Sequence, residues 1–228
     1  MANFQFTDQM LTGKTETHLI PLASPYATHH RLHADAHRAF CALQQSAVNA
    51  GFDLQPASSF RDFKRQQQIW NGKFLCQRKV HDDQGQALDL SCLDDWQKAQ
   101  AILRWSALPG ASRHHWGSEI DIYDPSLLPT GQTLQLEPWE YEAQGYFYEL
   151  AQWLAQALPH FDFTLPFSAA SHLEIGREPW HISYQPLAEQ AKVRFSAEIL
   201  LHSWKDEEIQ GVELLREKIP EIFTRFIK

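Results

Sequence analysis

The sequence predicts an α+β fold, in which helices pack on a small, mostly antiparallel sheet and further helices follow at the C-terminal end. Two patterns indicate this class. Apolar residues at three- and four-residue spacing over 33–50 are typical of an amphipathic helix, and the alternation over 118–123 is typical of a strand. The 228 residues are 43% hydrophobic and 21% charged, as in a globular protein. We expect a single domain over 1–228, with a core at about 33–184 and helices over about 186–228.

Local signals assign the elements of the first half. The helix over 33–50 ends at Gly51, a residue that leaves a helix without steric cost. A short strand over 52–60 follows and leads into a Ser-rich corner. A second helix is predicted over 62–74, with Asp62 as its N-cap because a carboxylate accepts from the free amides of the first turn.

The second half combines short strands with helices. The polar stretch 81–91 predicts a loop or hairpin, and the Leu-Pro-Gly sequence at 108–110 predicts a turn. The further elements expected are a helix over 94–105, a strand over 118–123, a long helix over 138–158, strands over 172–176 and 181–184, and helices over 186–204 and from Asp206 onward.

Charge and composition exclude several classes of protein. The net charge is −8, and no basic face suited to nucleic acid is evident. No stretch approaches the roughly 18 apolar residues of a membrane span. Residues 1–17 lack the basic and apolar regions of a secretory signal, so we expect a cytoplasmic protein, or a periplasmic or released one if a signal was removed or export follows another route. The three cysteines are irregularly spaced and predict no disulfide framework.

The first chemical motif is Ser112-Arg113-His114-His115-Trp116-Gly117-Ser118-Glu119-Ile120-Asp121. Gly117 permits a sharp turn, after which a strand brings Asp121 back beside His114. Strand alternation places Glu119 on the same face as Asp121. A His and an Asp held together in this way are suited to a metal, but such a pair also occurs as an ordinary hydrogen-bonded pair.

The second motif is Glu178-Pro179-Trp180-His181. A catalytic zinc takes three protein ligands and leaves a further position open, and it profits from a nearby carboxylate that accepts a proton from water. His114, Asp121 and His181 supply three such ligands, and Glu178 supplies the base. Pro179 interrupts strand pairing, so Glu178 and His181 need not follow simple alternation.

The third motif, Ser58-Ser59-Phe60-Arg61-Asp62-Phe63-Lys64-Arg65-Gln66, places an arginine at the end of a predicted strand. A guanidinium there can reach a carboxylate or a developing oxyanion. The alternative is a surface ion pair, for example with Asp62.

Together the three segments resemble the D-alanyl-D-alanine carboxypeptidases of the VanY type, in the wider zinc metallopeptidase group that includes lysostaphin and the hedgehog signalling domain. The family patterns are Ser-x-x-Arg-Ser-x-x-x-Gln, Ser-x-His-x-x-Gly-x-Ala-x-Asp and Glu-x-Trp-His, in that order. The residues that match them are Ser58, Arg61, Gln66, Ser112, His114, Gly117, Asp121, Glu178, Trp180 and His181. Two residues depart from the patterns, namely Asp62 in place of Ser and Glu119 in place of Ala. The resemblance extends over about 33–184.

The resemblance implies one zinc per chain, held by His114, Asp121 and His181, with Glu178 as the general base. It implies that Arg61 contacts the scissile carbonyl or the terminal carboxylate of the substrate. Ser112, Gln66 and Ser58 are then expected to help hold that substrate. Glu119 adds a carboxylate near the metal, and Asp62 is placed to neutralise part of the charge of Arg61.

The resemblance implies a zinc-dependent carboxypeptidase acting on D-amino-acid-terminated peptidoglycan peptides, and we expect it to be a monomer. A D,D-dipeptidase, an L,D-carboxypeptidase and a phage-type endopeptidase remain open, as does a zinc-bearing binding module without catalysis. The shape of the cleft, which is set by loops that include 75–91 and 124–137, is expected to decide among the substrates.

Other candidate sites are weaker. His33 and His37 have the spacing of a zinc helix, but Ala34 stands where a catalytic Glu is needed, so a solvated helix face is the better interpretation. His115 is expected to point away from its neighbour His114. No nucleophile elbow of the serine hydrolases is present in the sequence.

Overall fold

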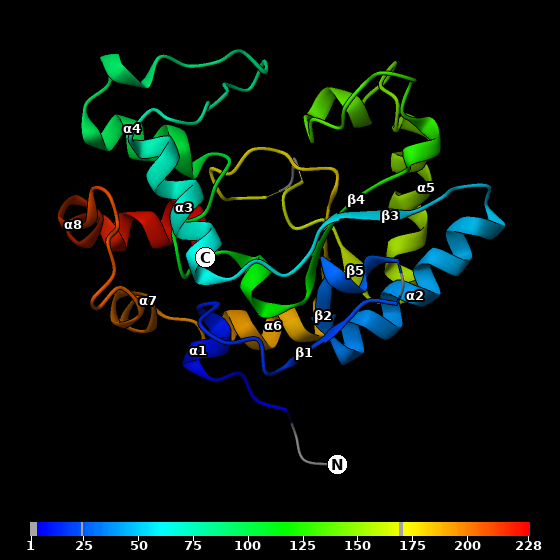
Figure 1. Ribbon diagram of the computed structural model, residues 1–228, viewed down its shortest axis with the longest axis horizontal. Helices are drawn as coiled ribbons and strands as arrows, with labels where there is room; N and C mark the ends of the chain where they lie inside the picture. Colours follow the sequence, from blue (N-terminus) through cyan, green and yellow to red (C-terminus); the bar gives the residue numbers. More distant parts are fainter. Residues whose placement is uncertain (1–3, 24, 169–170) are drawn as a thin grey trace.

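Helices surround a small central sheet in a computed structural model of the chain, which describes residues 4–23, 25–168 and 171–228 (Figure 1). The first three residues of the N-terminal segment 1–17 thus lie outside the description. The helices are α1 (Asp8–Leu11), α2 (Ala34–Asn49), α3 (Phe63–Phe74), α4 (Asp95–Leu103), α5 (Tyr148–Ala157), α6 (Gln185–Arg194), α7 (Ala197–Ser203) and α8 (Val212–Ile222). The strands are β1 (Leu19–Pro21), β2 (Arg31–His33), β3 (Gln55–Ser58), β4 (Glu119–Tyr123), β5 (Phe163–Thr164) and β6 (His181–Tyr184).

The central sheet has the strand order β3-β4-β6-β5, and all neighbouring strands are antiparallel. β1 and β2 form a separate antiparallel pair. The predicted fold class, helices packed on a small antiparallel sheet, is confirmed. None of the helices in the described ranges is both long and apolar enough to cross a membrane.

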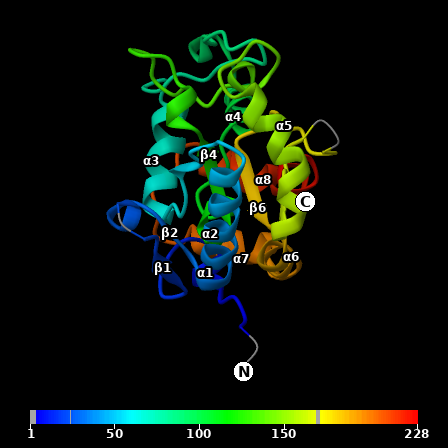
Figure 2. The same ribbon diagram turned by 90° about the vertical axis from the view of Figure 1, so that its right-hand side faces the viewer.

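The two faces of β4 have opposite chemistry. Ile120 and Ile122 are fully buried in the hydrophobic core, whereas Glu119 and Asp121 point to the other face. α2 contributes Ala36, Phe40, Leu43 and Ala47 to the core, the stripe that its sequence spacing predicts. α2 and α5 lie on one side of the sheet, and Figure 2, seen from that side, shows them in front of β4 and β6. The carboxylates of β4 therefore point away from the apolar interior.

The start of α3 follows the sequence closely. The Asp62 carboxylate accepts a hydrogen bond from the Arg65 amide at 2.6 Å, as expected of an N-cap. Asp62 is committed to this role and forms no ion pair with Arg61 among the described residues. The expected neutralisation of Arg61 by Asp62 is therefore wrong.

Of two further predicted elements, one is shorter than expected and the other is absent from the described chain. The long helix over 138–158 is limited to α5, because residues 138–147 form a short 3₁₀ turn and then reverse direction at Gln144, whose φ is +77°. Residues 172–176 form no strand, because the amides of Glu174 and Gly176 donate to the carbonyls of Arg225 and Arg104 instead of to a neighbouring strand.

The C-terminal helices are more divided than predicted. The helix over 186–204 is two helices, α6 and α7, because Phe195 is extended and the Ser196 side chain caps α7. The last helix, α8, begins at Val212, after Gly211 with φ +73°. The segment that follows α8 includes Phe226 and Ile227, which line the candidate site described below.

Candidate active site

Strand register brings the two most distant motifs together. Asp121 of β4 lies directly opposite His181 of β6, so that their side chains are neighbours on one face of the sheet. Asp121 Oδ1 lies 3.0 Å from His181 Nδ1, and Asp121 Oδ2 lies 3.3 Å from His114 Nε2. All three side chains are buried.

Gly117 makes the approach of His114 possible. The chain forms a 3₁₀ turn over Arg113–Trp116 and reverses at Gly117, whose φ is +71°. A Cβ atom at this position would lie 2.2 Å from a Leu19 side-chain carbon, so the left-handed turn and the close packing both require glycine. The predicted return of Asp121 to His114 is confirmed.

The outer nitrogen of each imidazole has a partner. His114 Nδ1 is 2.7 Å from the Ser59 carbonyl oxygen, and His181 Nε2 is 2.8 Å from Glu119 Oε2. A carbonyl can only accept, so His114 carries a proton on Nδ1 and its Nε2 atom is directed at Asp121. These bonds hold the rings in the orientation that metal-binding histidines generally require.

His114, Asp121 and His181 have the chemistry of a metal site. One ligand atom from each residue lies within 4.8 Å of the others, and theirs is the one group of three or more such residues found in the described part of the chain. Two imidazoles and one carboxylate are ligands that zinc takes at catalytic centres, where a further position stays open. The donor set therefore fits the zinc that the sequence predicts.

The His33 and His37 pair does not form a competing site. His33 Nδ1 accepts from the Asp35 amide at 3.2 Å and caps α2, and its side chain is largely buried. His37 lies 3.8 Å from the Cys41 sulfur. The predicted solvated face is thus wrong for His33, which has a capping role.

Glu119 is fully buried and belongs to a polar network under His181. Its Oε1 atom accepts from Ser183 at 2.8 Å, from Ser118 at 3.0 Å and from Arg113 at 3.2 Å. Burial opposes its ionisation, but Arg113 and His181 outweigh burial and lower the pKa of Glu119 to about 2. A charged Glu119 is thus a fixed acceptor for the outer nitrogen of His181, Nε2. The alanine that the family pattern has at this position could not accept this hydrogen bond.

The same carboxylates act on the metal-facing side. Burial opposes ionisation of Asp121, yet His114 and His181 hold its pKa far below the usual range. Burial likewise disfavours the charged form of His181, but hydrogen bonds to Asp121 and Glu119 raise its pKa to about 10. Asp121 and Glu119 therefore favour positive charge at the position where a cation would be bound.

Glu178 lies beside this group, in the loop that leads into β6. Its Oε2 atom is 3.6 Å from His181 Nδ1, and 14% of its side chain is exposed. Burial, with a contribution from Asp121, raises the pKa of Glu178 to about 7, against the opposing effects of His181, Arg61 and Lys73. A carboxyl group with such a pKa can accept and return a proton near neutral pH.

Arg61 reaches the site from the end of β3. Its Nη1 donates to Gln66 Oε1 at 2.9 Å, and Nη2 lies 3.5 Å from Ser58 Oγ. Gln66 is fully buried and donates to the Ala107 carbonyl at 2.6 Å. Ser58 and Gln66 therefore position Arg61, and neither lines the main cavity. Gln66 is too deeply buried to contact a substrate directly, whereas the substrate-holding role of Ser58 stays a prediction.

His115 points away from the cleft, as predicted. Its Nε2 accepts from the Gly110 amide at 3.1 Å, and its Nδ1 donates to the Arg61 carbonyl at 2.5 Å. Together with the His114 bond to Ser59, this contact ties the third motif to the first.

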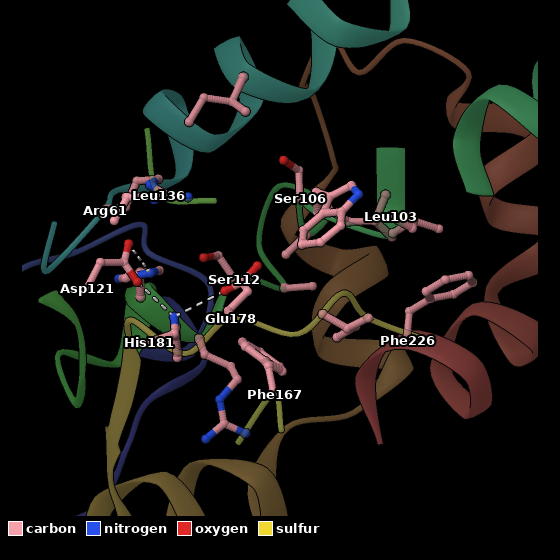
Figure 3. Close-up of a pocket in the computed structure, with 18 of the residues that line it drawn as sticks. Arg61, Leu103, Ser106, Ser112, Asp121, Leu136, Phe167, Glu178, His181 and Phe226 are labelled. Atoms are coloured by element: carbon pink, nitrogen blue, oxygen red, sulfur yellow. Dashed lines mark hydrogen bonds and ion pairs between the residues drawn. The ribbon is translucent and has the colours of Figure 1, made fainter. Parts of the chain in front are cut away.

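Arg61, His114, Asp121, Glu178 and His181 line one cavity of about 440 Å³, which is within the range of small-ligand sites. Figure 3 shows Asp121, His181 and Glu178 at one end, with Phe226 at the other. Ser112 lines the cavity as expected, and both predicted loops contribute, for example through His81 and Leu136. Phe226 and Ile227 also line it, although no signal in their sequence marks them as site residues.

Comparison with known proteins adds a family to this geometry. The family model described as VanY, D-alanyl-D-alanine carboxypeptidase, matches residues 29–187, which contain all three motifs. The chain belongs to the VanY family. The expected enzyme class, a hydrolase of the carboxypeptidase type, is thereby confirmed.

Two relatives of this VanY-family chain are uncharacterized proteins of Haemophilus influenzae. One is 59% identical over 121 residues, which are 53% of this chain and 92% of the relative. The other is 64% identical over 104 residues, or 46% of this chain and 71% of the relative.

Solved structures share the fold. VanYB in complex with D-alanine-D-alanine is 21% identical with a TM-score of 0.53, covering 79% of this chain and 84% of that one. A variant of the vancomycin resistance D,D-pentapeptidase VanY in complex with Zn(II) is 22% identical with a TM-score of 0.53, covering 78% and 84%. The LdcB LD-carboxypeptidase is 19% identical with a TM-score of 0.51, covering 78% and 72%.

A first prediction concerns the metal ligands of this VanY-family chain. The purified protein should hold about one zinc per chain, and His114→Ala or His181→Ala should each abolish this binding because one of only three protein ligands is lost. Elemental analysis after dialysis measures the content. His37→Ala is the matched control and should keep its zinc; full zinc in both site variants would show that the ligand assignment is wrong.

A second prediction concerns Glu119. Glu119→Ala removes the acceptor of His181 Nε2 and leaves Arg113 without its carboxylate, so zinc affinity should fall by roughly 10- to 100-fold, the usual effect of losing an outer hydrogen bond. Competition with a chelating dye measures this affinity directly. Unchanged affinity in a folded Glu119→Ala protein would show that the network does not support the ligand.

Proposed function

We propose that this chain is a zinc-dependent carboxypeptidase that releases the C-terminal D-amino acid from peptidoglycan-derived peptides. One observation carries the proposal: the three candidate ligands, the carboxylate of Glu178 and the guanidinium of Arg61 all face a single cavity. Membership of the VanY family and the D-alanine-D-alanine and Zn(II) complexes of structures with this fold support the choice of substrate and metal.

Glu178 is placed to move the proton. Bound zinc supplies Lewis acidity, which polarises a carbonyl and makes water a better nucleophile at neutral pH. Glu178 Oε2, next to His181 and partly open to the cavity, accepts the proton that the attacking water loses. The same oxygen then returns it to the amine of the leaving amino acid, which could not depart as an anion.

Arg61 is placed to balance negative charge. It has no carboxylate partner in an ion pair among the described residues, and Gln66 fixes the plane of its guanidinium. Burial lowers the pKa of Arg61, while Asp121 and Glu178 oppose this effect, so the cation is retained close to the reacting groups. Such a donor stabilises charge that develops on the carbonyl oxygen, or anchors a carboxylate of the substrate.

The intact base separates an enzyme from a binding module. Binding a metal needs only His114, Asp121 and His181, whereas Glu178 contributes a carboxylate whose pKa is matched to proton transfer. The presence of Glu178 in the cavity therefore favours catalysis over the non-catalytic alternative.

The direct test is hydrolysis of defined muropeptides. We expect the zinc-loaded protein to shorten a peptide ending in a D-amino acid by one residue, with the product read by mass spectrometry. Tripeptide, tetrapeptide and pentapeptide substrates distinguish D,D- from L,D-cleavage, a free dipeptide tests dipeptidase activity, and a cross-linked dimer tests endopeptidase activity. If none of these is cleaved, the proposed function is wrong.

A third prediction separates chemistry from metal binding. Glu178→Ala should retain zinc, because Glu178 is not a ligand, but kcat should fall by roughly 10²–10⁴-fold through the loss of a positioned acid–base group. Zinc content and steady-state kinetics are measured on the same preparation. Wild-type turnover in this variant would show that Glu178 is not the acid–base group, regardless of the metal content.

A fourth prediction concerns Arg61. Arg61→Ala should keep its zinc and lower kcat and kcat/KM together if the guanidinium acts only in the transition state. A rise in KM with little change in kcat would instead assign it to the substrate carboxylate. Arg61→Lys should rescue poorly, because Gln66 and Ser58 hold a planar, forked group that an ammonium cannot replace.

A further inference from the structure

The cavity is lined by more cations than carboxylates, although the whole chain is acidic. Five Lys or Arg residues line the cavity against three carboxylates, whereas the net charge of the chain is −8. Two of the three carboxylates already have roles: Asp121 contacts both imidazoles, and Glu137 accepts from His81 Nδ1 at 2.9 Å. Of the five cations, Arg113 pairs with Glu119, and the other four have no ion pair among the described residues, so the cavity has a local positive charge that favours an anionic ligand.

Lys73 is a half-buried cation of this cavity that the mechanism does not use. It follows Gln66 and Ile69 at helical spacing, so the same face of α3 carries the partner of Arg61 and a cavity wall. Lys73 Nζ donates to Ser106 Oγ at 2.7 Å, and no carboxylate among the described residues forms an ion pair with it. Burial, with a smaller effect from Arg61, lowers the pKa of Lys73 to about 8.

A partly buried ammonium without a counter-ion is costly, and a bound anion reduces that cost. Ser106 completes the arrangement, because a hydroxyl that accepts from Lys73 still has its own proton to donate. Figure 3 shows the Ser106 hydroxyl turned toward α3, on the cavity side opposite Phe167. One charged donor and one neutral donor thus lie within 2.7 Å of each other at the cavity wall.

The turn after α3 adds charge at the rim of the same wall. Cys76 adopts φ +58° and the amides of Gln77 and Arg78 both donate to the Gly72 carbonyl, so the chain folds back on the helix. A Cβ atom on Gly72 would lie 3.1 Å from Arg78 Cδ, so glycine lets the arginine stem pack closely. Arg78 and the adjacent Lys79 are exposed and line the cavity, where they attract an approaching anion.

We propose that Lys73 and Ser106 form a carboxylate-binding subsite of the cleft, separate from Arg61, with Arg78 and Lys79 at its entrance. The inference rests on the proposed function and extends it: the preferred substrate is a peptide that presents a free carboxylate to this subsite. Arg61 is then left for the scissile carbonyl. The carboxylate comes either from the C-terminus of the peptide or from an acidic side chain, and the experiment distinguishes the two.

The experiment combines one variant with three peptides. Lys73→Met removes the charge and keeps most of the side-chain volume. Lys64→Met is the matched control, because Lys64 lies on the same helix but pairs with Glu207 outside the cavity. Binding is measured by calorimetry in a zinc-loaded Glu178→Ala background, so that the peptide is not consumed. The peptides are a tetrapeptide acid ending in D-alanine, its C-terminal amide, and the acid with its side-chain carboxylate converted to an amide.

Lys73→Met should weaken binding of the tetrapeptide acid by roughly 10- to 100-fold, the effect of losing one hydrogen bond to a charged group. Lys64→Met should leave it within about twofold, as expected for an exposed ion pair. If the C-terminus supplies the carboxylate, the effect of Lys73→Met vanishes with the C-terminal amide; if a side chain supplies it, the effect vanishes with the side-chain amide.

An equal loss with all three peptides would overturn the subsite, because it would show a general structural effect of Lys73. No loss with any peptide, or no binding of the acid by the background protein, would overturn it as well. Hydrolysis by the wild-type protein is assayed separately. A chain that binds carboxylates through Lys73 but cleaves nothing would contradict the proposed function and leave the subsite supported.

Discussion

The site depends on the antiparallel pairing of β4 with β6, which places Asp121 opposite His181. A shift of one residue would turn Asp121 to the apolar face and bring Ile120 or Ile122 into the cavity. The buried isoleucines resist such a slip, because they would leave the core. The hydrophobic pattern of β4 therefore fixes the position of a polar group on its other face, and the geometry of the candidate ligands follows from core packing.

Burying so many ionisable groups at one place requires that each has a partner. Glu119 is satisfied by Arg113, Ser183 and His181, and Asp121 by the two imidazoles. Removing one member of such a network leaves the others desolvated and unpaired, which costs more than the pair itself contributes. Glu119 thus stands where the family pattern has a small residue, and it forms an ion pair with Arg113, so a change at either position alone leaves the other charge buried without its partner.

The sequence predicts those parts of the site that depend on interactions between neighbours in the chain. The turn at Gly117 and the cap at Asp62 were readable from the sequence, because backbone conformation and capping involve neighbours in the chain. The place of Gln66 cannot be predicted in this way, because its buried contacts with Arg61 and Ala107 depend on tertiary packing. The strand predicted over 172–176 is absent for the same reason, because the amides of Glu174 and Gly176 donate to the distant carbonyls of Arg225 and Arg104.

The contact between Asp121 and His181 joins residues 60 positions apart. A metal ion held by both would act as a cross-link that closes this loop, much as a disulfide does, and would restrict the unfolded chain more than a local ligand pair could. The enclosed segment carries Leu136 and Phe167, two walls of the cavity. The supply of metal and the folding of the chain are then coupled, because free metal adds to the stability of the native state by mass action. In a cell short of the ion, the protein would lose stability together with activity, and the less stable chain would be a better target for proteases.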